Sequence, residues 1–174
     1  MRTGLRDKRM NNAGLSLVEL VVVIAILAVL SAGSITIVGA INNARTKSCA
    51  QSIYSDIGRV KINTLAKEKS TDVGSSYFKL KRDASNNSVI EEGVNGTVVE
   101  KVIGSSDLTV SYEYGGSNVN LTSSSSAPAE CTFDRATGGV KDRNFDTITV
   151  SGVRASYVIT IYPATGKVEM ERVA

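Results

Sequence analysis

One segment constrains the fold of this chain more than any other. An uncharged, apolar run of 22 residues extends from Leu20 to Ile41, and a single carboxylate, Glu19, lies just before it. As an α-helix rising ~1.5 Å per residue, the run is roughly 33 Å long, enough to cross a hydrocarbon core of ~30 Å. A carboxylate in a spanning segment is costly and usually functional, so Glu19 requires a partner. We therefore predict a helix that anchors the chain in a membrane before assembly and packs against other helices afterwards.

The net charge of the chain is concentrated ahead of this run. The sequence has 20 basic and 17 acidic residues, and the first 14 residues alone, with four basic side chains against Asp7, account for the net charge of +3. Because basic flanks stay on the cytoplasmic side of a membrane, residues 1–14 are predicted to be a cytoplasmic leader peptide. The remaining residues are neutral in sum, so the basic isoelectric point does not indicate nucleic-acid binding.

The chain shows no catalytic constellation. It contains no histidine, which removes the usual general base and the commonest metal ligand. The acidic residues have no spacing that is typical of a metal loop. We therefore expect a structural or binding protein without a catalytic residue, a metal or a cofactor.

The hydrophobic pattern predicts one long helix from Leu15 to about Lys69, in two parts. Residues 15–42 are apolar on all sides, as in a transmembrane and assembly helix, and residues 43–69 continue the helix with an amphipathic pattern. The predicted buried side of that continuation consists of Ile53, Ile57, Val60 and Leu65. The predicted solvent side consists of Arg45, Lys47, Asp56, Arg59 and Lys61.

Residues 70–174 are predicted to form a β-rich globular domain. The expected strands are 77–81, 88–92, 108–114, 130–134, 147–150, 157–162 and 167–173. Residues 97–103 fit a short helix as well as a strand, and the Ser/Asn/Gly-rich residues 115–129 are expected to form an exposed loop. The predicted fold class is α+β, in which the back half of the long helix packs against a small antiparallel β-sheet domain and completes its core.

The chain contains two cysteines, Cys49 and Cys131, which are 82 residues apart. Two thiols without histidine cannot complete a zinc site. If the region after the anchor is exported, a disulfide between them would tie the helix to the distal domain, and the alternative is two buried free thiols. Neither cysteine has a candidate base nearby in sequence, so thiolate catalysis is not expected.

The segment Gly14-Leu15-Ser16-Leu17-Val18-Glu19 resembles the processing site of type IV pilins and pseudopilins. The resemblance implies that a prepilin peptidase cleaves between Gly14 and Leu15 and then methylates the amino group of Leu15. It also implies that Glu19 is the glutamate at the fifth position of the mature chain, which would meet the amino terminus of a neighbouring subunit. The family usually has phenylalanine where this chain has Leu15.

The same resemblance implies a fold, a location and partners. They are the pilin fold, a single-pass precursor in the cytoplasmic membrane with its leader in the cytoplasm, and assembly with other pilin subunits into an extracellular or periplasmic filament. Such filaments belong to pili, competence systems and secretion systems. Two alternatives are a secretory signal peptide cleaved near Ser31, which leaves Glu19 unexplained, and a plain single-pass anchor.

The closing residues 146–168 resemble those of H-type pseudopilins and FimT-like minor pilins. Lys167 and Arg172 are similar to basic residues that FimT-like proteins use on DNA, but Glu169 and Glu171 on the same strand largely cancel their charge. This pattern favours a solvated strand face over a DNA-binding one. The predicted function is a structural subunit, a minor pilin or pseudopilin, and the alternative is a filament-tip module that contacts DNA, a surface or an exported protein.

Overall fold

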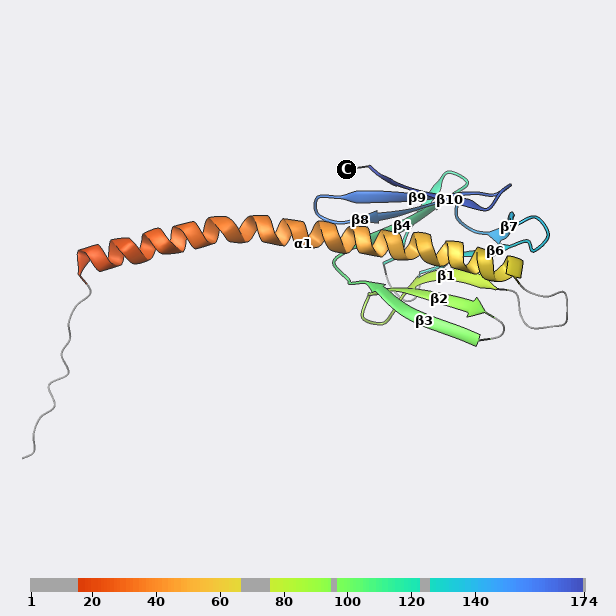
Figure 1. Ribbon diagram of the computed structural model, residues 1–174, viewed down its shortest axis with the longest axis horizontal. Coiled ribbons are helices and arrows are strands. Elements are labelled where there is room, and N and C mark those ends of the chain that lie inside the picture. Colours follow the sequence, from red (N-terminus) through yellow and green to blue (C-terminus); the bar gives the residue numbers. More distant parts are fainter. Residues whose placement is uncertain (1–15, 67–75, 95–96, 123–125, 174) are drawn as a thin grey trace, which may run out of the picture. The chain divides into compact units, whose positions relative to one another are not determined.

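A computed structural model of the chain describes residues 16–66, 76–94, 97–122 and 126–173. The side chains of residues 32–38 and Val94 are outside this description. The chain divides into two compact units, residues 1–38 and residues 39–174. Within the described residues, the elements are a single long helix and ten strands. Figure 1 labels the helix and most of the strands.

Helix α1 (Leu17–Ala66) begins at a polar cap. The Ser16 hydroxyl accepts a hydrogen bond from the backbone N–H of Glu19 at 3.1 Å, and the Ser16 carbonyl accepts the N–H of Leu20 at 3.1 Å. Serine is a preferred residue at this position because its side chain satisfies an N–H group that has no partner within the helix. The large apolar side chains from Leu17 to Leu30 are each about half exposed or more. Among the residues that the structure describes, no helix has the combined length and hydropathy of a membrane span.

Residues 77–172 form two antiparallel sheets of five strands each. Sheet A has the strand order β3-β2-β1-β6-β7 and consists of β1 (Tyr77–Arg82), β2 (Ser88–Val94), β3 (Thr97–Gly104), β6 (Ala129–Phe133) and β7 (Val140–Arg143). Sheet B has the order β10-β9-β8-β4-β5 and consists of β4 (Thr109–Tyr114), β5 (Ser117–Asn120), β8 (Thr147–Ser151), β9 (Ser156–Tyr162) and β10 (Lys167–Arg172).

One hydrophobic core joins the second half of α1 to both sheets. The helix contributes Ile53, Ile57 and Val60, all fully buried, and the cluster includes Phe78 from sheet A and Ile148 from sheet B. Figure 1 shows this part of the helix, in gold, beside strands of both sheets. Residues spaced three and four apart share one face of a helix, which is why this stripe reaches the core. The predicted α+β class is confirmed, and the antiparallel strands of the β-rich domain form two sheets.

Two predictions about the helix surface are wrong. Leu65 was expected on the buried side, and 44% of it is exposed. Asp56 was expected on the solvent side, and only 5% of it is exposed. Asp56 lies opposite strand β3, where the Lys101 ammonium group approaches its carboxylate at 3.6 Å. A helical pattern alone does not show how far a sheet extends around the helix, and sheet A covers Asp56.

The predicted loop 115–129 is also partly wrong. Strand β5 begins at Ser117 and pairs with β4, so that Tyr114 lies opposite Ser117. The connecting residues Gly115 and Gly116 have φ angles of 57° and 83°, as a tight two-residue hairpin turn requires. Strand β7 was not predicted. The ambiguous segment 97–103 is a strand, because it pairs with β2 along its whole length and forms the edge of sheet A.

Candidate functional site

The predicted processing site is only partly visible. Gly14 and Leu15 lie outside the described residues. Glu19 is exposed in the first turn of α1, three residues after the capping Ser16. An acidic side chain is stabilised there by the partial positive charge of the helix amino terminus. Glu19 thus lies in the first helical turn with its side chain exposed.

A second candidate site lies between α1 and the outer strands of sheet A. Asp56 on the helix and Glu92 on β2 are 5% and 3% exposed, and Arg59 bridges them. The Arg59 guanidinium lies 3.3 Å from Asp56 Oδ1 and 2.7 Å from Glu92 Oε2. The remaining oxygens, Asp56 Oδ2 and Glu92 Oε1, have no hydrogen-bond partner. Lys101 Nζ, at 3.6 Å from Asp56 Oδ2, is a salt-bridge neighbour beyond hydrogen-bond distance.

These carboxylates line an open cleft of about 480 Å³. Ile90 and Val99 supply apolar walls, and Arg59 and Lys101 are about half exposed at its border. Burial raises the pKa of Glu92 above its ordinary value, and the hydrogen bond from Arg59 opposes that rise. The hydrogen bond to Glu92 in turn raises the pKa of Arg59. Buried carboxylates with unpaired oxygens are uncommon in native proteins and call for an explanation.

Sequence reasoning missed this pair, although the chain holds a signal for it. Glu91 and Glu92 are consecutive in a strand, and consecutive side chains point to opposite faces of a sheet. One of the two therefore had to face the helix. The pairing of Glu92 with Phe78, which is fully buried, shows that Glu92 is the one on the inner face.

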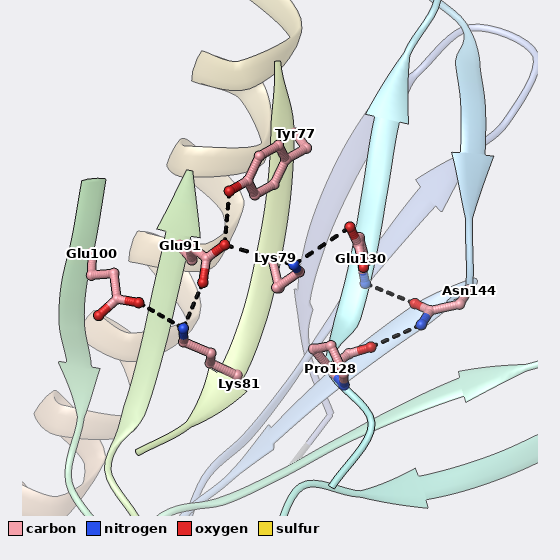
Figure 2. Close-up of polar contacts among 8 residues, drawn as sticks. All are labelled: Tyr77, Lys79, Lys81, Glu91, Glu100, Pro128, Glu130 and Asn144. Carbon is pink, nitrogen blue, oxygen red and sulfur yellow. Dashed lines mark hydrogen bonds and ion pairs between the residues drawn. The ribbon is translucent and has the colours of Figure 1, made fainter. Parts of the chain in front are cut away.

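The outer face of sheet A has a different character, shown in Figure 2. Lys81 donates to Glu91 at 2.5 Å and to Glu100 at 2.6 Å, so it joins three neighbouring strands. Lys79 lies 3.6 Å from Glu91 and 3.7 Å from Glu130. The hydrogen bond from Lys81 is the main cause of a lowered pKa at Glu91. The charges of this face are paired with one another, as in a solvated sheet surface, and such pairs contribute about 0–1 kcal/mol each.

Of the two alternatives for the cysteines, a disulfide and two buried free thiols, this structure has the free thiols. Cys49 on α1 and Cys131 on β6 are both free and both buried in the core. Burial raises the pKa of the Cys49 thiol to about 11 and that of the Cys131 thiol to about 12. Thiols with such pKa values stay protonated at neutral pH, which disfavours nucleophilic chemistry.

The last strand carries paired charges. Lys167 lies 2.5 Å from Glu169, whose carboxylate also accepts a hydrogen bond from the Tyr162 hydroxyl at 2.7 Å. Tyr112 and Tyr157 are buried core residues.

Among the described residues, no three side chains of the types His, Cys, Asp and Glu lie close enough to hold a metal ion.

Residues 9–35 match the protein-family model described as the prokaryotic N-terminal methylation motif. This motif is the signal of type IV pilins and pseudopilins, which a prepilin peptidase processes and which assemble with other pilin subunits. It spans Gly14, Leu15 and Glu19 and ends within α1. The comparisons with curated proteins and with solved structures found no match. The motif points to a structural subunit, and the H-type or FimT-like assignment has no support beyond the resemblance of the closing strands.

Proposed function

We propose that this protein is a minor pilin or pseudopilin, a subunit of a type IV pilus, a competence filament or a type II secretion-type filament. The methylation motif at residues 9–35 is the observation that carries the proposal. The fold is consistent with it, because an exposed apolar helix leads into a β-rich unit with a core of its own.

In this proposal, the precursor is a single-pass protein of the cytoplasmic membrane, with residues 1–14 as its cytoplasmic leader. Residues 15–42 are the transmembrane and assembly segment, residues 43–69 continue the helix, and residues 70–174 form the β-rich domain. The prepilin peptidase cleaves between Gly14 and Leu15 and methylates the amino group of Leu15. The apolar helices then leave the lipid and pack together in the filament, because each apolar side chain exposed on one helix is buried by its neighbours.

Glu19 is the residue that we propose to set the position of one helix against the next. A lone carboxylate in an apolar environment is costly, and a cationic amino terminus of a neighbouring subunit would neutralise it. The exposure of Glu19 in the first helical turn supports this role, since no side chain within the described residues pairs with it.

Mass spectrometry of the mature protein tests the proposed processing. The expected amino terminus is an N-methylated Leu15, and a different terminus would contradict the proposal. The register role is tested by the rate of filament assembly. Glu19→Ala should slow assembly, whereas Glu171→Ala, which removes an exposed carboxylate from β10, should not. Assembly of Glu19→Ala at the wild-type rate would show that Glu19 does not set the register.

A filament-tip binding module remains the second function. Trace amounts in sheared filaments, together with an effect on filament number, would favour a minor subunit at the tip. The paired charges around Lys167 and Glu169 favour a protein or surface contact over DNA. DNA binding by the full chain that weakens steeply with added salt would contradict that preference.

A further inference from the structure

Strand β3 is an unusual edge strand. It is the outermost strand of sheet A, so one side of its backbone has no strand partner within the described residues. Residues 97–102 are all exposed, and Val98, Val99 and Val102 are each half exposed or more. Natural proteins usually protect such edges with charged side chains, proline, bulges or covering loops, because an exposed apolar edge pairs with other chains. Strand β3 carries Glu100 and Lys101, and its pairing with β2 is irregular near Val89, but its three valines are still exposed.

The open cleft lies under this edge. Val99 and Lys101 point to the helix-facing side of sheet A, opposite Glu92 and Ile90 on β2. Asp56 and Glu92 also line the cleft, and one oxygen of each, Asp56 Oδ2 and Glu92 Oε1, is buried without a hydrogen-bond partner. These belong to different elements, α1 and β2, and both side chains are more than nine-tenths buried. The free edge and the unsatisfied acceptors therefore belong to one surface.

We propose that the edge of β3 and this cleft bind an extended segment of another protein chain, in which a lysine or arginine stands between apolar residues. The segment adds a strand to sheet A through backbone hydrogen bonds with β3. Its basic side chain passes over Val99 and donates to Glu92 Oε1 and Asp56 Oδ2.

The unsatisfied acceptors and the shape of the cleft both favour this occupant. On the helix-facing side, the carboxylates of Asp56 and Glu92 are matched in number by Arg59 and Lys101, but one oxygen of each carboxylate still has no donor. The apolar walls of the cleft suit the aliphatic stem of lysine or arginine, whose charged tip then reaches the acceptors. An added strand would lie about 10 Å from β2, two strand spacings away, which requires a long side chain. A metal ion is a poorer fit, because the described residues offer no group of three acidic, cysteine or histidine ligands.

The outer face of the same sheet offers no comparable site. There, Glu91 and Glu100 share Lys81, and Glu130 pairs with Lys79 (Figure 2). A basic segment would have to displace these lysines. The helix-facing side is therefore the one that selects for a cationic side chain, and Glu130 is a suitable control residue.

The proposal is tested with the full-length protein in detergent and labelled peptides whose binding is followed by fluorescence anisotropy. The probe is acetyl-Thr-Val-Lys-Val-Thr-amide, and its matched control carries norleucine, which has a similar stem without the charge, in place of lysine. The lysine peptide should bind roughly ten- to a hundredfold more tightly, as expected for hydrogen bonds to charged acceptors. Two further peptides carry N-methyl groups on alternate amides, one peptide on each edge of the extended chain. One of the two should not bind, because β3 needs hydrogen bonds from one edge of the peptide.

Two variants locate the contact. Glu92→Gln should weaken the binding of the lysine peptide by roughly tenfold or more and leave the binding of the norleucine peptide unchanged, since only the charged acceptor is lost. Glu130→Gln should leave the binding of both peptides unchanged. Equal binding of the two peptides, or no binding at about 1 mM, would overturn the proposal. Insensitivity to N-methylation on both edges would also overturn it. The peptide changes leave the protein intact, so these results stand even if Glu92→Gln perturbs the fold.

Discussion

The ring of Tyr77 lies over Gly93 on the neighbouring strand. The two residues are directly opposite in the pairing of β1 with β2, and a Cβ atom built on Gly93 would stand 2.2 Å from Tyr77 Cε1. The Tyr77 hydroxyl donates to Glu91 Oε1 at 2.8 Å, which holds the ring in place (Figure 2). An aromatic ring thus covers a strand position that lacks a side chain of its own, an arrangement that stabilises glycine in sheets.

Gly93→Ala should therefore destabilise the protein by about 1–3 kcal/mol, because the ring must leave its position. Urea unfolding measures the change. The control is Gly58→Ala in α1, where an added Cβ meets no atom within 4 Å. That substitution should stabilise the helix by roughly 0.5–1 kcal/mol. Effects of the same sign and size in the two variants would contradict the proposed packing of Tyr77.

Arg82 is a buried cation that joins three loops, and its removal should be costly. Its guanidinium donates to the carbonyl groups of Leu121 at 2.9 Å, Asn86 at 2.8 Å and Leu108. Arg82→Met should lower the free energy of unfolding by about 3 kcal/mol or more, because three carbonyl groups lose a charged donor. Arg82→Lys should recover only part of the lost free energy of unfolding, since an ammonium group lacks the planar arrangement of N–H donors of a guanidinium group. Full recovery by lysine would contradict the three-way geometry.

The two thiols should be unreactive in the folded protein. With a pKa of about 11, Cys49 has roughly a hundredfold smaller thiolate fraction than a thiol at its ordinary pKa of 9.0. Iodoacetamide at neutral pH should therefore modify Cys49 and Cys131 only after unfolding, as followed by mass spectrometry with and without denaturant. Rapid modification of the native protein, or a disulfide-linked peptide pair, would contradict the structure.

The turn between β1 and β2 should make the stability of the protein depend on pH in the acidic range. The Asp83 carboxylate accepts hydrogen bonds from the backbone N–H groups of Ser85 and Asn87, and the bonds with Asn87 lower its pKa below the ordinary 3.8. A lowered pKa contributes stability that is present above that ordinary value and is lost as pH falls through the folded value. The free energy of unfolding of Asp83→Ala should therefore be lower than that of the wild type at neutral pH. The difference between the two free energies should become smaller in acid. A difference independent of pH would exclude this contribution.

The contribution of Glu92 to stability should change with pH in the opposite direction. Because burial raises its pKa in the folded state, the folded protein holds this proton to higher pH than the unfolded chain. Stability then falls as pH rises above the ordinary value of 4.5, and it levels off above the raised folded pKa. The stability of Glu92→Gln relative to the wild type should thus increase over this window. Arg59, Asp56 and Lys101 face Glu92 from the helix and β3, and they are unchanged in the comparison. Urea unfolding of both proteins at several pH values provides the test. A difference in free energy of unfolding that does not change with pH would contradict the prediction.

Local patterns were sufficient for several elements. The spacing of Ile53, Ile57 and Val60 identifies the buried side of the helix, because residues three and four apart meet on one face. The alternation in Tyr157–Tyr162 identifies β9 in the same way, since a strand turns every second side chain inward. The methylation motif is likewise a local feature, recognisable in residues 9–35 without knowledge of the fold.

Other features depend on residues that are far apart in the chain. The sequence of residues 97–103 fits a helix and a strand equally, because its valines match both periods, and the pairing with β2 makes it a strand. The Gly115-Gly116 turn was overlooked because the composition of the segment favoured a loop, although paired glycines are a hairpin signal. Cys49 and Cys131 are buried free thiols, which their spacing in the sequence could not show.

Local sequence was enough for the long helix, the basic character of residues 1–14, the methylation motif and the β-rich remainder, because each depends on neighbours within a few residues. The grouping of the strands into two sheets, the burial of Asp56 and the Arg59 bridge from Asp56 on α1 to Glu92 on β2 are features of the tertiary structure. The physical reason is that burial depends on which distant segments pack together. A carboxylate on the polar side of a helix is exposed unless a sheet extends over it, and here sheet A does.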